Sequence, residues 1–357
     1  MKNKDKYRGC LIGGAAGDAL GYAVEFSDVA KIFEKYGENG ITEYELTDGV
    51  AQISDDTQLS LFTANGLVYA QATCIFAGIG IPEYIKWVRY AYLEWYKTQT
   101  EQFPLTEGDN LMWIVNNPEL FSQRSPGRTC LSAIKDGANG EIENPINDSK
   151  GSGGVMRVAP VGLCLHVNTK AFRLFFTSLG AEVAALTHGH ELGYIPAAAL
   201  VHIIQLLTHS DDATIEYSVG NMKEVIKQLF ASAQHLDNFI DLIDKAIELS
   251  GKNMKDADAI KQLGEGWVAE EAIAIAIYCA LKYSDDFEKA LIASVNHGGD
   301  SDSTGAITGN IMGARLGLEN IPQKFIDNLE LKDIIIELAD DLFNEASFSE
   351  GENEERG

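Results

Sequence analysis

Glycines recur at every fourth position in two segments near opposite ends of this 357-residue chain. The two sets are Gly9, Gly13, Gly17 and Gly21, and Gly305, Gly309, Gly313 and Gly317. A spacing of four runs along one face of an α-helix. Because each glycine costs a helix about 1 kcal/mol relative to alanine, another element must approach closely enough to compensate. The pattern therefore predicts two helices that pack tightly against each other.

The second glycine segment opens with the sequence HGGDSDSTG, which begins at His297. Asp300 and Asp302 lie two residues apart in it and alternate with the hydroxyls of Ser301 and Ser303. Carboxylate and hydroxyl oxygens on a glycine-flanked turn are suitable ligands for a hard cation such as Mg²⁺. Helix capping alone would account for one Asp and one Ser. It would not account for the second Asp, because neighbouring carboxylates repel each other unless a cation or a proton lies between them.

A calcium loop of the EF-hand type is an alternative for this segment. Asp300, Asp302, Thr304 and Gly305 match positions one, three, five and six of that loop. The twelfth position, which requires a bidentate Glu, is Ile311. The sequence therefore favours an oxygen-rich metal site of another kind.

A second acidic cluster consists of Ser54, Asp55 and Asp56. Ser54 is a favourable N-cap, and the two aspartates suit the first turn of a helix because the helix dipole favours negative charge there. Capping therefore explains much of this cluster taken alone. Together with Asp300 and Asp302, however, it supplies four carboxylates with flanking hydroxyls, which fit a two-metal site.

The third candidate segment is a glycine-rich stretch, SKGSGGVMR, which begins at Ser149. Its backbone N–H groups can bind phosphate, and Lys150 and Arg157 are positive charges in an acidic protein. It is not a P-loop, because GxxxxGK[ST] is absent, and the first glycine segment lacks GxGxxG. The alternative is a flexible loop that leads into a helix.

Several single residues give weaker indications that they belong to a functional site. Asp18 and Glu25 interrupt an apolar N-terminal region, where each is either a structural acid or part of a site. His188 and His190 would face different ways on a helix, so they make a poor zinc pair. Trp267 follows a glycine turn and could stack on a flat ring, although core packing is equally consistent with its position.

Helical periodicity dominates the chain, and no strand-like alternation persists. Helices are expected over residues 59–70, 84–97, 181–202, 215–249 and 267–283, with the sequence THGH inside the third, and an irregular stretch over 139–154. We therefore predict an all-α fold with one compact multi-helix domain over residues 1–346. Residues 347–357 are charged and poor in apolar side chains, so they are expected to form a disordered acidic tail.

The composition limits the classes of partner and the cellular compartments that we expect for this protein. The net charge of −25 argues against a nucleic-acid surface or an anionic membrane as a partner. The five cysteines form no CxxC pair, so neither a disulfide framework nor a zinc knuckle is indicated. No targeting segment is visible, and the longest uncharged apolar run, 272–281, is half the length that spans a bilayer. These features predict a soluble, cytoplasmic protein.

Six short motifs, taken in order, resemble those of the ADP-ribosylglycohydrolase family. They are RGCLIGGAAGDALG, ISDDTQLSL, KGSGGVMRVAP, LTHGH, GWVAEEA and HGGDSDSTGAI, and the resemblance runs from about residue 7 to 320. Its best-known members are the dinitrogenase reductase-activating glycohydrolases and the eukaryotic ADP-ribosyl-acceptor hydrolases. The resemblance implies an all-α fold, a centre of two Mg²⁺ or Mn²⁺ ions per chain, and hydrolytic release of ADP-ribose from modified protein side chains.

The resemblance also implies roles for the residues at matching positions. Metal ligands are implied at Ser54, Asp55, Asp56, Asp300, Asp302 and Ser303. The four aspartates are implied to be catalytic together with Glu25, which matches a mobile glutamate that guards the metals in some relatives. Substrate contacts are implied for Lys150, Gly151, Ser152, Gly153, Gly154, Met156, Arg157, His188 and Trp267. Many relatives carry Thr in place of Ser54 and another residue in place of Ser152.

The expected reaction is hydrolysis of the N-glycosidic bond of ADP-ribosyl-arginine through an oxocarbenium-like state. The two metals would orient the ribose diol and lower the pKa of a bound water. One alternative is cleavage of O-linked ADP-ribosyl-serine or of O-acetyl-ADP-ribose on the same metals, and another is a non-catalytic ADP-ribose-binding relative. We expect a monomer whose partner is an ADP-ribosylated protein and whose product ligand is ADP-ribose.

Overall fold

A computed structural model of the protein describes residues 3–78, 80–106, 110–164, 168–210 and 212–354, with side chains described as far as Asn344. These residues form fifteen α-helices and five short 3₁₀ helices, and their only β structure is three isolated bridges. The prediction of an all-α, single compact domain is confirmed. The predicted tail of 347–357 begins beyond the last described side chain and stays a prediction.

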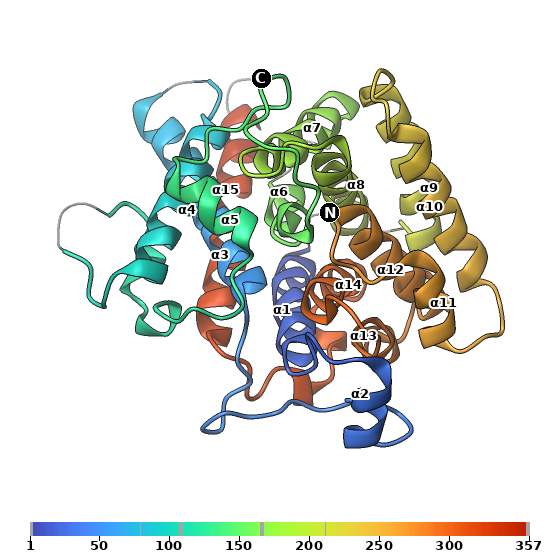
Figure 1. Cartoon of the computed structure of the whole chain (residues 1–357). Coiled ribbons are helices and arrows are strands. Elements are labelled where there is room, and N and C mark those ends of the chain that lie inside the picture. Colours follow the sequence, from blue (N-terminus) through green and yellow to red (C-terminus); the bar gives the residue numbers. More distant parts are fainter. Residues whose placement is uncertain (1–2, 79, 107–109, 165–167, 211, 355–357) are drawn as a thin grey trace.

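The α-helices are α1 (Lys4–Tyr22), α2 (Val29–Tyr36), α3 (Asp55–Ala77), α4 (Tyr84–Thr100), α5 (Arg128–Lys135), α6 (Ala159–Leu163), α7 (Lys170–Ala185), α8 (Glu191–His209), α9 (Ile215–Leu229), α10 (Leu236–Ser250), α11 (Asp256–Leu263), α12 (Ala269–Lys282), α13 (Phe287–Val295), α14 (Ser301–Leu316) and α15 (Lys332–Glu354). The 3₁₀ helices are η1 (Trp113–Asn116), η2 (Pro118–Leu120), η3 (Ser152–Gly154), η4 (Leu318–Asn320) and η5 (Gln323–Phe325). In Figure 1, α1 and α14 lie together at the centre, with α3, α4 and α15 on one side and α9 to α12 on the other.

Helices α1 and α14 pack against each other through the two sets of glycines. A Cβ atom on Gly13 would lie 2.3 Å from the carbonyl oxygen of Gly309, and one on Gly309 would lie 1.9 Å from that of Gly13. The same backbone contact recurs in the pairs Gly9 with Gly313 and Gly17 with Gly305. No side chain fits at these distances, so the predicted pairing of two glycine-rich helices is confirmed.

The pairing is antiparallel, because residue numbers rise along α1 as they fall along α14. The C-terminal end of α1 therefore lies against the N-terminal end of α14. A Cβ atom on Gly21 would be 2.2 Å from the carbonyl oxygen of Ser301. This geometry brings Asp18 and Glu25 towards the turn that carries Asp300.

The prediction of one continuous helix over 181–202 is wrong. The sequence THGH, residues 187–190, lies in the turn between α7 and α8. His190 accounts for the new start, because its ring Nδ1 accepts a hydrogen bond from the Leu192 N–H at 3.0 Å and caps α8. The spacing of apolar residues, on which the helix prediction rested, gives no indication that a His side chain caps a helix.

The predicted helix over 215–249 is also interrupted, and forms α9 and α10. The carboxylate of Glu191 accepts hydrogen bonds from the backbone N–H groups of Gln234 (3.0 Å) and His235 (2.8 Å), which fixes the intervening turn to the start of α8. The expected helices over 59–70 and 84–97 are confirmed with longer bounds, as α3 and α4.

Two helices, α3 and α8, are long and apolar enough to cross a membrane by length and composition alone. Within this structure, 67% of the apolar window of α3 and 100% of that of α8 are buried. Such burial is typical of core helices in a globular domain, and it accounts for their apolar sequences.

Replacing a glycine of the α1–α14 contact should destabilise the protein. Gly309→Ala is expected to lower the free energy of unfolding by roughly 1–3 kcal/mol, because the new methyl group must force two backbones apart. Chemical denaturation measures this change. The matched control is Gly220→Ala in α9, where a Cβ atom would meet nothing within 4 Å. That variant should be neutral or more stable by up to about 1 kcal/mol, and equal losses in both variants would contradict the account.

Candidate active site

The first acidic cluster is held at the start of α3. Ser54 is the N-cap, and its Oγ accepts a hydrogen bond from the Asp56 N–H at 3.2 Å. Asp55 and Asp56 follow in the first turn and are buried. The Asp55 Oδ2 accepts from the Gly127 N–H at 3.3 Å, whereas Asp56 Oδ2 is buried without a hydrogen-bond partner among the described residues. Helix capping therefore does not account for Asp56.

The sequence did not decide between a structural role and a site role for Asp18. Its side chain, on α1, fixes the first acidic cluster at the start of α3. Its fully buried carboxylate accepts hydrogen bonds at 3.0 Å from the backbone N–H groups of Ser54 and Thr57, and another from the Thr57 hydroxyl. Burial raises the pKa of Asp18 to about 6, and these hydrogen bonds oppose the rise. Asp18 is thus a positioning residue, and its place in an apolar region, directly after Gly17, was the available signal.

The second acidic cluster lies at the start of α14. Asp300 caps the helix by accepting from the Ser303 N–H at 3.4 Å, and Asp302 Oδ1 accepts from the same N–H at 3.0 Å. The preceding turn is fixed by Glu265, whose carbonyl oxygen accepts from the Asp300 N–H at 2.8 Å. A Cβ atom on Gly299 would lie 1.9 Å from that oxygen, so only glycine fits there.

The two clusters and the end of α1 together form a group of six acids. They are Asp18, Glu25, Asp55, Asp56, Asp300 and Asp302, and burial is the main reason that the pKa of each is raised. Neighbouring carboxylates raise the pKa of Asp56 and Asp302 further. Half-buried Glu25 has its pKa raised to about 7, and its Oε2 has no partner among the described residues. The group thus gathers six acids where water is largely excluded and where their charged forms are disfavoured unless a cation is present.

The chemistry of this acid group fits divalent cations. Buried carboxylates this close together need protons or cations between them, and carboxylate and hydroxyl oxygens are the ligands that Mg²⁺ and Mn²⁺ prefer. In the part of the chain described, no group of three or more His, Cys, Asp or Glu side chains is already arranged to hold a metal ion. The ligand types are therefore present, and side chains would have to move to enclose an ion.

The glycine-rich loop joins the acid group to a second part of the site. Ser152 Oγ donates to Asp300 Oδ2 at 2.6 Å. Gly151 forms an isolated antiparallel bridge with Val268, and the Ser152 N–H donates to the Trp267 carbonyl oxygen at 3.2 Å. The loop, with η3 at its end, is therefore fixed rather than merely flexible, and it lies between the acid group and the segment that begins α12.

Two residues predicted to contact substrate lie behind this loop. His188 and Arg157 are buried, and both bond to the Thr187 hydroxyl, at 2.8 Å and 2.5 Å respectively. Burial and the nearby guanidinium lower the pKa of His188 to about 3, so its ring is neutral. A Cβ atom on Gly153 would lie 3.2 Å from the His188 ring. These two side chains support the loop from within, and direct contact with substrate stays a prediction.

Met156 and Trp267 occupy contrasting positions. Met156 is buried, and its Sδ accepts a hydrogen bond from the Ser303 hydroxyl at 3.8 Å. Trp267 is 38% exposed and stacks on Phe26, with 5.5 Å between ring centroids and 18° between ring planes. Its exposure argues against the alternative of core packing that the sequence left open.

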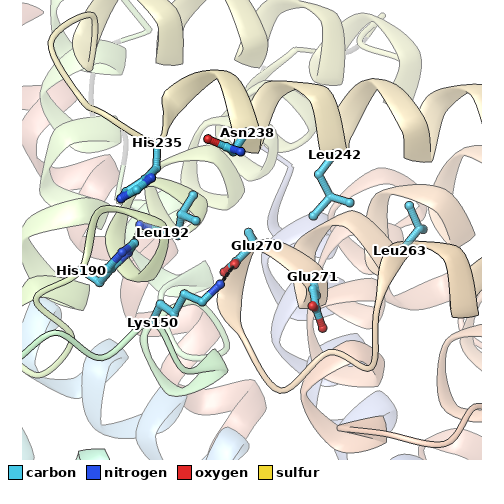
Figure 2. Close-up of a pocket in the computed structure, with 9 residues that line it drawn as sticks. All are labelled: Lys150, His190, Leu192, His235, Asn238, Leu242, Leu263, Glu270 and Glu271. Atoms are coloured by element: carbon cyan, nitrogen blue, oxygen red, sulfur yellow. Dashed lines mark hydrogen bonds and ion pairs between the residues drawn. The ribbon is translucent and has the colours of Figure 1, made fainter.

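A cavity of about 460 Å³ opens beside Lys150, between the start of α8, helix α10 and the start of α12 (Figure 2). It is lined by Lys150, His190, Leu192, His235, Asn238, Leu242, Leu263, Glu270 and Glu271. Lys150 forms an ion pair with Oε1 of buried Glu270, whose Oε2 has no partner among the described residues. The rings of His190 and His235 stack at 4.9 Å between centroids. Among these residues, sequence reasoning assigned a role in the site only to Lys150, because only the fold brings them together.

A buried ion pair, also missed, fixes the segment before the first acidic cluster. Arg124 donates to Glu330 through both terminal nitrogens, and the side chains are 10% and 8% exposed. Arg124 also donates to the Ile53 carbonyl oxygen, and Glu330 accepts from the Ile53 N–H, both at 3.1 Å. The partners lie 206 positions apart, so no local motif could reveal the pair.

The metal-free protein should lose stability as pH rises from about 4 to about 7. The pKa of Asp18 is raised from 3.8 to about 6, and that of Glu25 from 4.5 to about 7. In this window the folded state binds more protons than the unfolded state, so the free energy of unfolding falls as pH rises. Thermal unfolding in chelator, measured at several pH values, gives the slope.

Saturating Mg²⁺ or Mn²⁺ should flatten that slope, because cations replace protons between the carboxylates and stabilise the folded state to which they bind. The same slope with chelator and with either metal would show that the acid group does not bind divalent cations.

Comparison with known proteins agrees with this geometry. A family model described as ADP-ribosylglycohydrolase matches residues 1–351. The chain is 25% identical over 371 residues to ADP-ribosylhydrolase ARH3 of Mus musculus, covering 96% of this chain and 93% of the relative. It is 25% identical over 340 residues to ADP-ribosylarginine hydrolase Tri1 of Serratia proteamaculans, covering 95% and 79%.

A solved structure described as an ADP-ribosylglycohydrolase-related protein complex shares the fold, with a TM-score of 0.54 and 20% identity, and the match covers 96% of this chain and 98% of that one. Since the family model spans nearly the whole chain, and the fold gathers the acidic motifs around the glycine-rich loop, this protein belongs to the ADP-ribosylglycohydrolase family.

Proposed function

We propose that this protein is a metal-dependent hydrolase that releases ADP-ribose from modified protein side chains, mainly by cleaving the N-glycosidic bond of ADP-ribosyl-arginine. The observation that carries the proposal is the hydrogen bond from Ser152 to Asp300, which joins the glycine-rich loop to the acid group. A substrate with phosphates next to a sugar can therefore contact both parts at once. ADP-ribose has this form, because its diphosphate is attached to the ribose whose C1″ carries the acceptor.

The acid group would hold two divalent cations, Mg²⁺ or Mn²⁺. Their ligands would be Ser54, Asp55, Asp56, Asp300, Asp302 and Ser303. Bound cations supply two effects, orientation of the ribose diol and a lowered pKa for a bound water. The N-termini of α3 and α14 also favour negative charge where the acidic clusters lie, so they support the ionised ligands.

Hydrolysis breaks the bond between C1″ and the acceptor nitrogen and adds the elements of water across it. The oxocarbenium-like state carries positive charge, which surrounding carboxylates stabilise. One carboxylate accepts the proton of the attacking water, and a proton reaches the departing nitrogen. Asp56 Oδ2 and Glu25 Oε2 are the buried oxygens of the acid group without hydrogen-bond partners among the described residues, so they are our candidates for this base.

We place the adenosine half of the substrate in the cavity beside Lys150. The cavity continues from the glycine-rich loop, where the diphosphate would lie. The unpartnered Glu270 Oε2 can accept a hydrogen bond from a ribose hydroxyl or an exocyclic amine. The stacked histidine rings and the amide of Asn238 offer an aromatic edge and a donor–acceptor pair to a base.

Arginine is our preferred acceptor because of charge. The chain carries a formal net charge of −25, and the acid group concentrates negative charge at the reaction centre. A cationic guanidinium is attracted by such a field, whereas a serine hydroxyl is not. The name of the Serratia relative, ADP-ribosylarginine hydrolase, is consistent with this choice. The cytoplasmic location and monomeric state predicted from the sequence are part of the same proposal.

The test is ADP-ribose release from arginine-modified and serine-modified protein, with Mg²⁺, with Mn²⁺ and with chelator. Metal-dependent release from the arginine substrate is expected. Release from the serine substrate alone would change the proposed linkage from arginine to serine and leave the proposed type of reaction unchanged. Tight binding of ADP-ribose by folded protein without any release would favour a non-catalytic binder instead.

Asp56→Asn and Asp302→Asn should each lower kcat/KM by more than roughly 10- to 100-fold. That range is the loss expected on removal of a residue that only hydrogen-bonds to a metal ligand, whereas these two residues would be ligands themselves. Each substitution keeps the side-chain volume but removes a charged ligand. The control is Asp333→Asn, at an exposed position on α15, which should retain activity. Wild-type activity in either site variant would contradict the assignment.

Asn238→Ala should weaken ADP-ribose binding by roughly 2- to 12-fold, as expected for one lost hydrogen bond, and leave kcat nearly unchanged. Calorimetric titration with ADP-ribose gives the dissociation constant. Asn253→Ala, at an exposed position after α10, is the matched control. An unchanged affinity for ADP-ribose in Asn238→Ala would contradict the placement of adenosine in this cavity.

A further inference from the structure

Phe26 has an unusual conformation and an unusual position. Its φ angle is +63°, in the left-handed region that bulky side chains avoid, and its side chain is 71% exposed. It directly follows Glu25, whose pKa is raised in part by Asp300. Strained backbone of this kind persists where the surrounding structure holds it, and it concentrates at functional sites.

The structure holds Phe26 from two directions. On one side its ring stacks on Trp267, with 5.5 Å between centroids. On the other, the segment after it packs against the turn before Asp300, because a Cβ atom on Gly298 would lie 3.3 Å from the Val29 nitrogen. The Phe26–Trp267 pair therefore connects the Glu25 turn to the segment that begins α12.

The pair is anchored next to the reaction centre. The carbonyl oxygen of Trp267 accepts a hydrogen bond from the Ser152 N–H at 3.2 Å, and the Ser152 hydroxyl donates to Asp300 at 2.6 Å. Two exposed aromatic rings thus border the acid group, on the side where the Glu25 turn and the glycine-rich loop meet. An exposed aromatic pair that costs strain to maintain is suited to binding rather than to core packing.

Charge indicates what such a pair would bind. Fully ionised, the six acids exceed the charge of two divalent cations by two negative charges. Two neighbouring protein cations, Lys150 and Arg124, are already paired with Glu270 and Glu330, and the guanidinium of Arg157 lies buried behind the glycine-rich loop, bonded to Thr187. A ligand that brings its own positive charge would therefore be favoured beside these rings.

We propose that Phe26 and Trp267 form an acceptor site, in which an exposed ring face binds the guanidinium of the ADP-ribosylated arginine by a cation–π interaction. The inference rests on the proposed function and adds to it the residues that select the acceptor. The guanidinium is planar and stacks on aromatic faces. The hydroxyl oxygen of an O-linked acceptor carries no charge and gains little from a ring face, so the pair discriminates between the two linkages.

The experiment compares kcat/KM for two peptides of the same flanking sequence, one ADP-ribosylated on arginine and one on serine. Phe26→Ala should lower the arginine-over-serine preference roughly 3- to 30-fold, the range that corresponds to one cation–π contact. Phe26→Tyr keeps an aromatic face and should retain the preference. The affinity for free ADP-ribose, which lacks an acceptor, should stay within about twofold and shows that the variant is folded.

Trp267→Leu is the second variant, and it removes the ring on which Phe26 stacks while leaving the Phe26 side chain in place. It should lower the same preference. Equal losses on both peptides would overturn the acceptor site and reduce the pair to a support for the Glu25 turn, while the proposed hydrolase would stand. Wild-type cleavage of the serine peptide alone would also overturn the acceptor site. Cleavage of neither peptide by the wild-type protein would overturn the proposed function as well.

Discussion

The contact between the glycine faces of α1 and α14 is the constraint on which the rest of the structure depends. At the paired glycines, two helices from opposite ends of the sequence meet backbone to backbone. Their antiparallel direction sets the end of α1 against the start of α14. Asp18 then reaches the start of α3 through three hydrogen-bond donors, so both acidic clusters are placed by the same pair of helices.

This arrangement places six acids close together in the interior, and their ionised forms require a compensating positive charge. Burial raises the pKa of each acid in the group, and nearby carboxylates raise those of Asp56 and Asp302 further. A fold does not concentrate uncompensated acids in its interior without cost. Bound divalent cations would offset this cost, and the residues that would hold them lie beside a loop suited to phosphate. In the proposed function, stability, metal binding and catalysis would therefore depend on one group of side chains.

Much of this could be predicted from the sequence, and the limits have physical causes. The glycine spacing indicated a close helix pair, and Ser54 correctly marked the start of α3. Breaks in helices were missed where their cause was distant, as with Glu191, which fixes the turn between α9 and α10. The ion pair of Arg124 with Glu330, and the cavity beside Lys150, join elements far apart in the chain. Arg157, which is predicted to contact substrate, lies buried against Thr187, a position that the sequence alone did not indicate.

The central claim is that the starts of α3 and α14 form one centre for two divalent cations. Anomalous diffraction from crystals soaked in Mn²⁺ tests it most directly. The account predicts two strong peaks between the clusters of Ser54–Asp56 and Asp300–Ser303, with ligands from both helices. Peaks only at surface carboxylates, or none in crystals that hold ADP-ribose, would contradict it.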